Sequence, residues 1–238
     1  MAEKEISIVL PAYNEALRIE KCIQEVEKAV RSLSSSYELI VTEDGSTDGT
    51  NNIVAELSRR NPHLSLLHSP VRLGKGKAIK RALSSAKGEI IIFMDVDLAT
   101  SLDYLQQIVS LARTCHGMAI GSRHVKGAKV QRRLSRTVSS LIYNLFVRIL
   151  FLDGVHDHQC GFKAMSRGVA DALLGKIRSD GFFFDTEMIL WCRKLGFTVV
   201  EVGVEWADTR KEGSAVKLFP DSLKLGLDLL KFRLTGDP

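Results

Sequence analysis

Residues 90–97, which read Ile-Ile-Ile-Phe-Met-Asp-Val-Asp, decide the fold class. The first five are apolar at every position, and this predicts a strand that is buried on both faces. Similar short apolar runs occupy residues 6–10, 39–42 and 64–67, and apolar residues at helical spacing follow each run. Buried strands that alternate with helices are typical of a parallel sheet covered on both faces. We therefore predict an α/β fold with a mainly parallel sheet.

The chain becomes less regular after Gly121. A basic segment, residues 122–136, leads into an apolar stretch at 138–152 that is too short to cross a bilayer. Residues 218–234 combine leucines with lysine and arginine, which predicts an amphipathic helix with a basic face. Both apolar segments are compatible with packing into the core or with lying in a membrane interface.

Length and composition favour one folded domain. The 238 residues are 45% hydrophobic and 26% charged, which suits a single large α/β unit and excludes a disordered chain. The four cysteines are scattered without metal-ligand spacing, as expected for reduced thiols in a cytosolic compartment. Neither a signal peptide nor an apolar run of about 18 residues is visible. We expect a cytoplasmic protein that no segment anchors across a membrane.

The charge distribution is uneven. Residues 104–152 contain no acidic residue although the chain has 28 of them. The same stretch carries eight basic residues: Arg113, Arg123, Lys126, Lys129, Arg132, Arg133, Arg136 and Arg148. This pattern predicts an anionic partner such as a phosphorylated lipid, an anionic membrane face or a nucleic acid. A solvated basic face without any ligand is the simpler alternative.

Polar clusters follow three of the predicted strands. Residues 11–15 (PAYNE) follow the first, residues 43–46 (EDGS) the second, and Asp95 and Asp97 the fourth. Ligands of open parallel sheets bind outside the carboxyl ends of the strands, so three clusters there predict one site. Taken alone, residues 44–46 are also compatible with a tight turn that caps a helix.

Asp95 and Asp97 are the candidate metal ligands. They lie two residues apart, so in an extended chain both carboxylates point to the same side. Such a pair can hold Mg²⁺ or Mn²⁺ against a diphosphate, because hard cations prefer oxygen ligands. An acid that caps the following helix is the alternative, but it accounts for only one of the two.

Three further segments could contribute to the site. Residues 72–77 (RLGKGK) could bring backbone amides close to a phosphate, although neither a P-loop nor a dinucleotide-binding glycine motif is present. Residues 157–163 (DHQCGFK) are rich in polar side chains, but His158 beside Cys160 favours packing and a turn over a nucleophile. Asp185 begins a second carboxylate pair, which is compatible with contacts to a bound ligand and with a helix cap.

Together, residues 8–15 (IVLPAYNE), 43–48 (EDGSTD) and 95–97 (DVD) resemble the inverting family 2 glycosyltransferases of GT-A fold. The resemblance extends from Ile6 to about Lys217. It departs from the family pattern at Glu43, where aspartate is usual.

Within that family, residues 72–78, 121–123 and 157–163 resemble the polyprenyl-phosphate hexosyltransferases. They are more similar to the dolichyl-phosphate β-glucosyltransferases than to the dolichyl-phosphate mannose synthases. Leu98 departs from the glucosyl branch, which often has glycine there.

The resemblance implies roles for particular residues. It places Asp95, Asp97, Arg123 and Arg136 in catalysis, with Asp95 and Asp97 as metal ligands. It implies nucleotide contacts from Pro11, Tyr13, Glu15, Asp44, Lys77 and Asp95. It implies acceptor contacts from Arg123, Arg136, Gln159, Lys163 and Asp185. The single domain, residues 1–238, would then consist of a donor half at 1–121 and an acceptor half at 122–238.

The expected reaction is transfer of a hexose, glucose from UDP-glucose in the first instance, to a polyprenyl phosphate with inversion. A phosphate monoester is largely a dianion at neutral pH, so it needs positioning and charge masking more than a general base. The enzyme would act as a peripheral protein at the cytosolic face of a membrane. Alternatives are GDP-mannose as donor, a non-lipid acceptor, and a nucleotide-binding regulatory subunit without turnover. Nucleic acid is not expected, because the basic stretch lacks interleaved aromatic residues.

Overall fold

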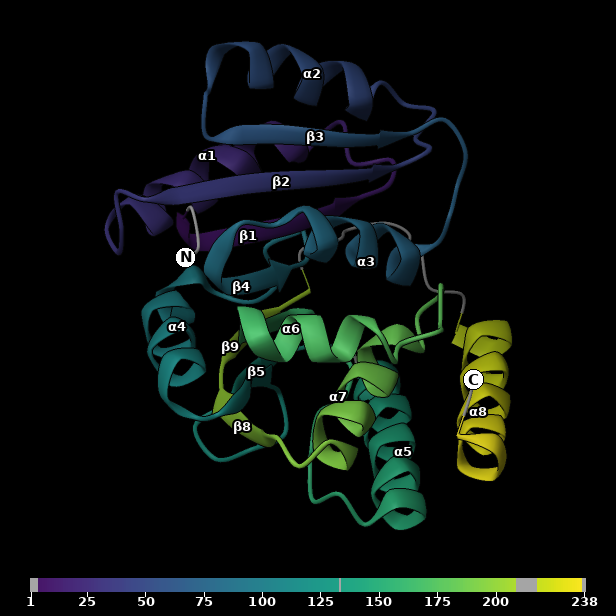
Figure 1. The fold of residues 1–238 in the computed structure, drawn as a ribbon. Helices are drawn as coiled ribbons and strands as arrows, with labels where there is room; N and C mark the ends of the chain where they lie inside the picture. The colour runs from purple at the N-terminus through teal and green to yellow at the C-terminus, as the bar shows by residue number, and fades with distance from the viewer. Residues whose placement is uncertain (1–3, 133, 209–217, 237–238) are drawn as a thin grey trace.

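The computed structural model describes residues 4–132, 134–208 and 218–236, the last range without the side chains of 218–224. A seven-stranded sheet forms its centre, with the strand order β3-β2-β1-β4-β7-β5-β8 (Figure 1). The strands are β1 (Lys4–Ala12), β2 (Tyr37–Asp44), β3 (Leu64–Ser69), β4 (Gly88–Met94), β5 (Gly117–Ser122), β7 (Phe162–Ser166) and β8 (Thr198–Gly203). The α/β fold and the four strands predicted from apolar runs are confirmed.

Strand β7 is the exception to the parallel arrangement. It runs antiparallel to both of its neighbours, with Ile92 of β4 opposite Ala164 and Ala119 of β5 opposite the same residue. The pairs β1–β2, β1–β4, β2–β3 and β5–β8 are parallel. A strand in the middle of a sheet is apolar on both faces whichever way it runs, so its sequence does not encode its direction.

Helices cover both faces of the sheet. Alternate residues of each central strand fill separate cores, as Ile92 and Phe93 do in β4. The core on one face includes residues of α1 (Ile19–Arg31), α2 (Thr50–Arg60) and α4 (Leu105–Thr114), which follows the short helix η1 (Leu102–Tyr104). The core on the other face includes residues of α3 (Lys75–Ser85), α6 (Arg167–Leu174) and α7 (Phe184–Lys194).

A third, smaller cluster lies beyond the main sheet. Helices α5 (Leu134–Phe151) and α8 (Leu218–Thr235) run beside α7 (Figure 1). The ring of Phe232 contacts the rings of Phe151, Phe183 and Trp191, and these contacts tie α8 to the rest of the molecule. Two short parallel strands, β6 (Lys129–Gln131) and β9 (Glu205–Ala207), form a separate small sheet.

Helix α5 exposes most of its large apolar residues and buries two polar ones. Ser140 and Asn144 are buried together with Val147. Large apolar side chains of the same helix are exposed: Leu134, Val138, Leu141, Ile142, Leu145, Phe146 and Ile149. Within the part of the chain that the structure describes, no helix has the length and apolar character needed to cross a membrane.

Helix α8 adds to this exposed apolar surface. Leu225, Leu229 and Phe232 are buried against α5 and α7. Among the other side chains of α8 that the structure describes, those of Leu227, Leu230 and Leu234 are exposed. The predicted amphipathic helix is therefore present, but three of the leucines that suggested it, Leu227, Leu230 and Leu234, are exposed. Leu223 and Lys224, which belonged to that prediction, lie outside the described side chains.

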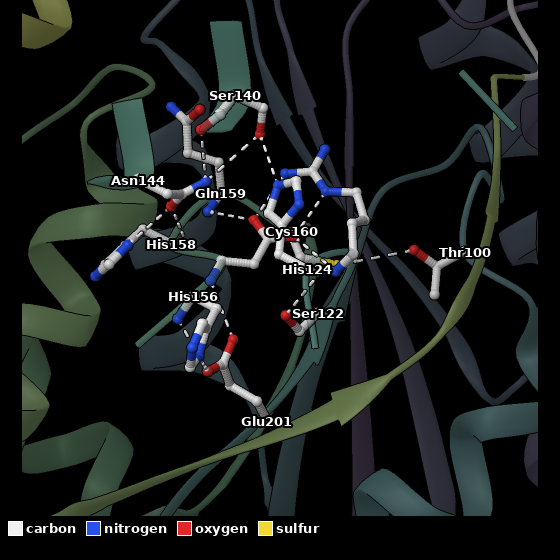
Figure 2. Close-up of polar contacts among 12 residues, drawn as sticks. Thr100, Ser122, His124, Ser140, Asn144, His156, His158, Gln159, Cys160 and Glu201 are labelled. Atoms are coloured by element: carbon white, nitrogen blue, oxygen red, sulfur yellow. Dashed lines mark hydrogen bonds and ion pairs between the residues drawn. The ribbon is translucent and has the colours of Figure 1, made fainter. Parts of the chain in front are cut away.

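Hydrogen bonds explain why α5 turns Asn144 inward. Asn144 Oδ1 accepts a hydrogen bond from the backbone amide of His158 and lies 2.9 Å from His158 Nδ1 (Figure 2). Its Nδ2 donates to Ser140 O, and His158 Nε2 lies 2.6 Å from a carboxylate oxygen of Asp153. The buried amide thus connects α5 to residues 153–158, which lead into the sequence motif at 157–163.

We expect Asn144→Ala to lower the free energy of unfolding by about 1–3 kcal/mol, because it leaves buried groups of His158 unpaired. The control Leu145→Ala removes an exposed apolar side chain of the same helix and should change that free energy by less than about 0.5 kcal/mol. Urea unfolding followed by circular dichroism measures both values. Equal effects of the two substitutions would show that the polar contacts do not orient α5.

Candidate functional site

A cleft of about 1450 Å³ runs along the carboxyl ends of the parallel strands and continues beside α5. It brings together ten of the residues that the sequence singled out: Pro11, Tyr13, Glu15, Asp44, Asp95, Asp97, Arg123, Arg136, Gln159 and Asp185. Segments far apart in the sequence therefore share one site, as the topology of an open parallel sheet requires. Two other predicted residues, Lys77 and Lys163, do not line the cleft.

The loops after β1 and β2 are fastened to each other. The backbone amide of Asn14 donates to Ser46 Oγ, and Asn14 Oδ1 accepts from the amide of Thr47, both at 2.9 Å. The amide of Glu15 donates to Thr50 Oγ1 at 2.9 Å. The alternative of a tight turn at residues 44–46 that caps a helix is wrong, because Asp44 ends β2 and α2 (Thr50–Arg60) begins only after Gly49.

Protein oxygens already engage the amides of the glycine-rich segment. Asp44 accepts hydrogen bonds from the amides of Leu73 and Gly74 at 2.6 and 3.0 Å, and Asp180 O accepts one from Gly76 at 2.9 Å. A Cβ atom on Gly74 would overlap Asp180 O, so glycine permits this close approach. The segment packs against the chain and does not present these amides to a phosphate.

Lys75, rather than the predicted Lys77, lies in the cleft. Its Nζ lies 3.0 Å from Asp95 Oδ1 and 3.1 Å from Asp185 Oδ2. Lys77 is exposed, because it lies two residues after Lys75 in α3 and therefore points to a different side of the helix. The spacing of the motif indicated a lysine in the site, and the helix start at Lys75 decides which one.

Lys163 is fully buried beneath the cleft. Its Nζ lies 2.6 Å from Asp185 Oδ1 and donates to Cys160 O at 2.6 Å. The expected acceptor contact from Lys163 is therefore wrong, because strand β7 directs this side chain into the protein. Asp185 is left between two ammonium groups, those of Lys163 and Lys75.

The four charges form an alternating series, Asp95–Lys75–Asp185–Lys163. Burial opposes the charge of Lys75, but the carboxylates of Asp185 and Asp95 outweigh it and raise the pKa of the lysine. Burial likewise opposes the charge of Asp185, but Lys163 and Lys75 outweigh it and lower the pKa of that carboxyl. Lys75 and Asp185 therefore remain charged at neutral pH.

The residues around Asp95 and Asp97 suit a divalent cation. A small pocket borders both carboxylates, Gly161 and Trp206. A Cβ atom on Gly161 would overlap the carboxylate of Asp95, so glycine leaves this group room. Among the described residues, no group of three or more acidic, histidine or cysteine side chains could hold a metal. Two carboxylates suffice for an ion that takes its other ligands from water and phosphate.

The two arginines expected to meet the acceptor already hold carboxylates. Arg123 makes a bidentate pair with the buried Asp157, at 2.7 and 2.8 Å. Burial opposes the charge of Asp157, but Arg123 outweighs it and holds the pKa of the carboxyl well below its usual range. Arg136 Nη1 lies 3.0 Å from Asp208 Oδ2. The acid-free stretch is thus neutralised in part by acids from outside it.

The motif at 157–163 is structural in several ways at once. Asp157 holds Arg123, His158 holds α5, and Gly161 leaves room for Asp95. Burial raises the pKa of the Cys160 thiol to about 11, so this cysteine is no nucleophile at neutral pH. The prediction that His158 and Cys160 serve packing is confirmed, since both are buried.

Besides Lys75, sequence reasoning missed Arg72, Arg132 and Trp206, which also line the cleft. The guanidinium of Arg72 lies 4.0 Å from the ring centroid of Tyr13. The guanidinium groups of Arg132 and Arg123 lie 5.3 and 5.7 Å from the ring centroid of Trp206. Arg72 and Arg132 belong to segments that the sequence had marked, but no local pattern distinguished them from their neighbours. Trp206 carried no such signal.

Comparison with known proteins places this geometry in context. The model of glycosyl transferase family 2 matches residues 7–174. Glycosyltransferase AglD of Haloferax volcanii is 36% identical over 98% of the chain, which spans only 38% of that relative. The human dolichyl-phosphate beta-glucosyltransferase is 30% identical over 97% of the chain and 75% of its own length.

Solved structures show the same fold. Glucosyl-3-phosphoglycerate synthase from Mycobacterium tuberculosis, in complex with Mn²⁺, UDP and phosphoglyceric acid, superposes with a TM-score of 0.72. The match covers 99% of this chain and 80% of the synthase at 24% identity.

We expect Gly161→Ala to weaken Mn²⁺ binding about 10- to 100-fold, because the added methyl group displaces the carboxylate of Asp95. Titration calorimetry with Mn²⁺ in the presence of UDP measures the affinity. Gly168→Ala is the matched control, since a Cβ atom there meets nothing within 4 Å. Unchanged Mn²⁺ affinity in a folded Gly161→Ala protein would exclude Asp95 as a ligand.

Proposed function

Because the chain belongs to glycosyl transferase family 2, we propose that it transfers glucose from UDP-glucose to a polyprenyl phosphate such as dolichyl phosphate, with inversion. One observation carries the proposal: a single cleft joins the paired carboxylates Asp95 and Asp97 to a wall of arginines and to the exposed apolar side of α5. The dolichyl-phosphate beta-glucosyltransferases, which are similar over most of the chain, support the choice of sugar and lipid.

Residues 1–121 form the donor half in this proposal. Tyr13 and Arg72 flank the nucleotide base, and Pro11 and Glu15 complete that wall of the cleft. Asp44 acts mainly by holding residues 73 and 74 in place, since its carboxylate already accepts two amides.

Asp95 and Asp97 hold Mg²⁺ or Mn²⁺, the ions that the oxygen donors of this pocket suit. The ion, when bound, supplies positive charge to the departing diphosphate. Lys75 lies beside Asp95 and adds a fixed positive charge to the same part of the cleft.

Residues 122–238 form the acceptor half. An oxygen of the acceptor phosphate attacks the anomeric carbon while the bond from that carbon to the diphosphate oxygen breaks, and this direct displacement inverts the configuration. The phosphate is largely ionised at neutral pH, so the protein must orient it and mask its charge. Gln159 and Asp185 line the cleft between the two halves, where they can orient the sugar.

The lipid tail lies along α5 in this proposal. Ile142 and Phe146 line the cleft and belong to the exposed apolar side of the helix, so the cleft and this side are continuous. Exposed apolar surface of this extent marks an interaction site in a folded protein. Arg148 and Arg233 lie on the same pair of helices and suit an anionic headgroup layer. The enzyme thus binds peripherally to the cytosolic face of a membrane.

We expect labelled glucose from UDP-glucose to become extractable into organic solvent when the protein is incubated with short polyprenyl phosphates and Mn²⁺. Asp97→Asn should lower that rate by at least about 100-fold, because the charge of the departing diphosphate is no longer neutralised. Asp103→Asn removes an exposed carboxylate outside the cleft and should leave the rate unchanged. If label is transferred only from GDP-mannose, the proposed donor is wrong. If label is transferred only to water-soluble acceptors, the proposed lipid acceptor is wrong.

We expect the protein to float with liposomes that contain anionic lipid, and to float less at high salt. The double substitution Leu141→Glu and Leu145→Glu should reduce the bound fraction by at least about tenfold, because it removes apolar contact with the acyl layer. Leu17→Glu changes a side chain that is 96% exposed elsewhere and serves as the control. Equal flotation of all variants would contradict binding through α5.

A further inference from the structure

Arg132 is a half-buried cation close to the arginines Arg123 and Arg136 of the cleft. It lies just before α5 and lines the cleft. Its Nε and Nη1 are buried and have no hydrogen-bond partner among the residues that the structure describes. Burial and the neighbouring Arg123 lower the pKa of its guanidinium to about 10, so the side chain is still charged at neutral pH. Buried donors on a charged group are costly when they remain unpaired.

Its two arginine neighbours differ from it in this respect. Arg123 is held by Asp157 and Arg136 by Asp208, so each already has its anion. Arg132 is the third guanidinium of this group. Of the three, it alone has buried nitrogen atoms without a hydrogen-bond partner among the described residues. The family resemblance implied that Arg123 and Arg136 contact the acceptor, whereas the contacts in the structure leave Arg132 to bind its phosphate.

Trp206 places the guanidinium between the two halves of the cleft. Arg132 lies over this ring at 5.3 Å from its centroid, and the same ring borders the small pocket of Asp97. Arg132 also lies two residues before Leu134, the first residue of α5, and Ile142 of this helix lines the cleft. An anion bound here would lie between the candidate metal pocket and the exposed apolar side of α5.

We infer that Arg132 binds the phosphate group of the acceptor through its unpaired Nε and Nη1, while Arg123 and Arg136 shape the site around it. The inference rests on the proposed function for the identity of the ligand. A guanidinium suits this task because its planar fork can donate two parallel hydrogen bonds to a phosphate. The bound phosphate also removes the cost of leaving the buried donors unpaired.

The test compares Arg132→Gln with Lys129→Gln in the full chain. Lys129→Gln also removes one positive charge, from the adjacent strand β6. Lys129 is exposed and does not line the cleft. We expect Arg132→Gln to raise the acceptor KM about 10- to 100-fold, as loss of a hydrogen bond to a charged group does. The KM for UDP-glucose and the kcat at saturating acceptor should stay within about twofold. Arg132→Lys should restore only part of the loss, because it lacks the fork.

Thermal unfolding provides a readout that does not depend on turnover. Without ligand, Arg132→Gln should leave the Tm equal to that of the wild type or raise it, because it removes unpaired buried donors. Citronellyl phosphate should raise the Tm of the wild type and of Lys129→Gln, but not that of Arg132→Gln. Citronellol, which lacks the phosphate, should raise none of them.

The outcomes separate the inference from the proposed function. An unchanged acceptor KM, or a preserved Tm rise with citronellyl phosphate in Arg132→Gln, would overturn the role of Arg132. A raised KM for UDP-glucose with an unchanged acceptor KM would assign Arg132 to the donor diphosphate and overturn the inference. If the wild type transfers no sugar to any prenyl phosphate, the proposed function fails, and the Tm series alone then decides whether Arg132 binds the phosphate.

Discussion

The buried ammonium of Lys163 is the constraint around which the site is arranged. A charge in the protein interior is tolerated only when it is paired and hydrogen-bonded, and Asp185 with Cys160 O meets that need. Asp185 in turn holds Lys75, and Lys75 reaches Asp95. One series of charges thus connects β7, α7, α3 and the end of β4, so the orientation of the candidate metal ligand depends on a lysine that never meets the cleft.

Many polar side chains of the cleft form hydrogen bonds or ion pairs with other parts of the protein and so hold its loops in place. Asp44 binds the backbone of the segment before α3, and Asp157 binds Arg123. Groups fixed in this way need little reorganisation when a charged ligand arrives, and such preorganisation is a large part of what enzymes contribute to catalysis. The guanidinium of Arg132 differs from these groups, because its Nε and Nη1 have no hydrogen-bond partner among the residues that the structure describes.

The sequence was sufficient for the first half of the fold and for the place of the site, because continuous apolar strands and the polar residues after them are local signals. It could not reveal the direction of β7, since a buried strand has the same composition either way. Nor could it show that Lys163 is buried or that Asp208 pairs with Arg136, because both facts depend on distant segments. The family resemblance is confirmed, whereas the individual residue roles stay predictions.

The position of β7 also constrains the order in which the molecule can be assembled. Strand β4 pairs with β1 on one side and with β7 on the other, and β5 reaches the sheet only through β7. During synthesis the outer edge of β4 therefore stays open until residues 95–161 have followed it. Open strand edges are templates for wrong pairing, so the nascent chain is most prone to aggregate in this interval. Strand β7 also carries Lys163, so the strand that closes this edge brings into the interior a charge that needs Asp185 of the later helix α7.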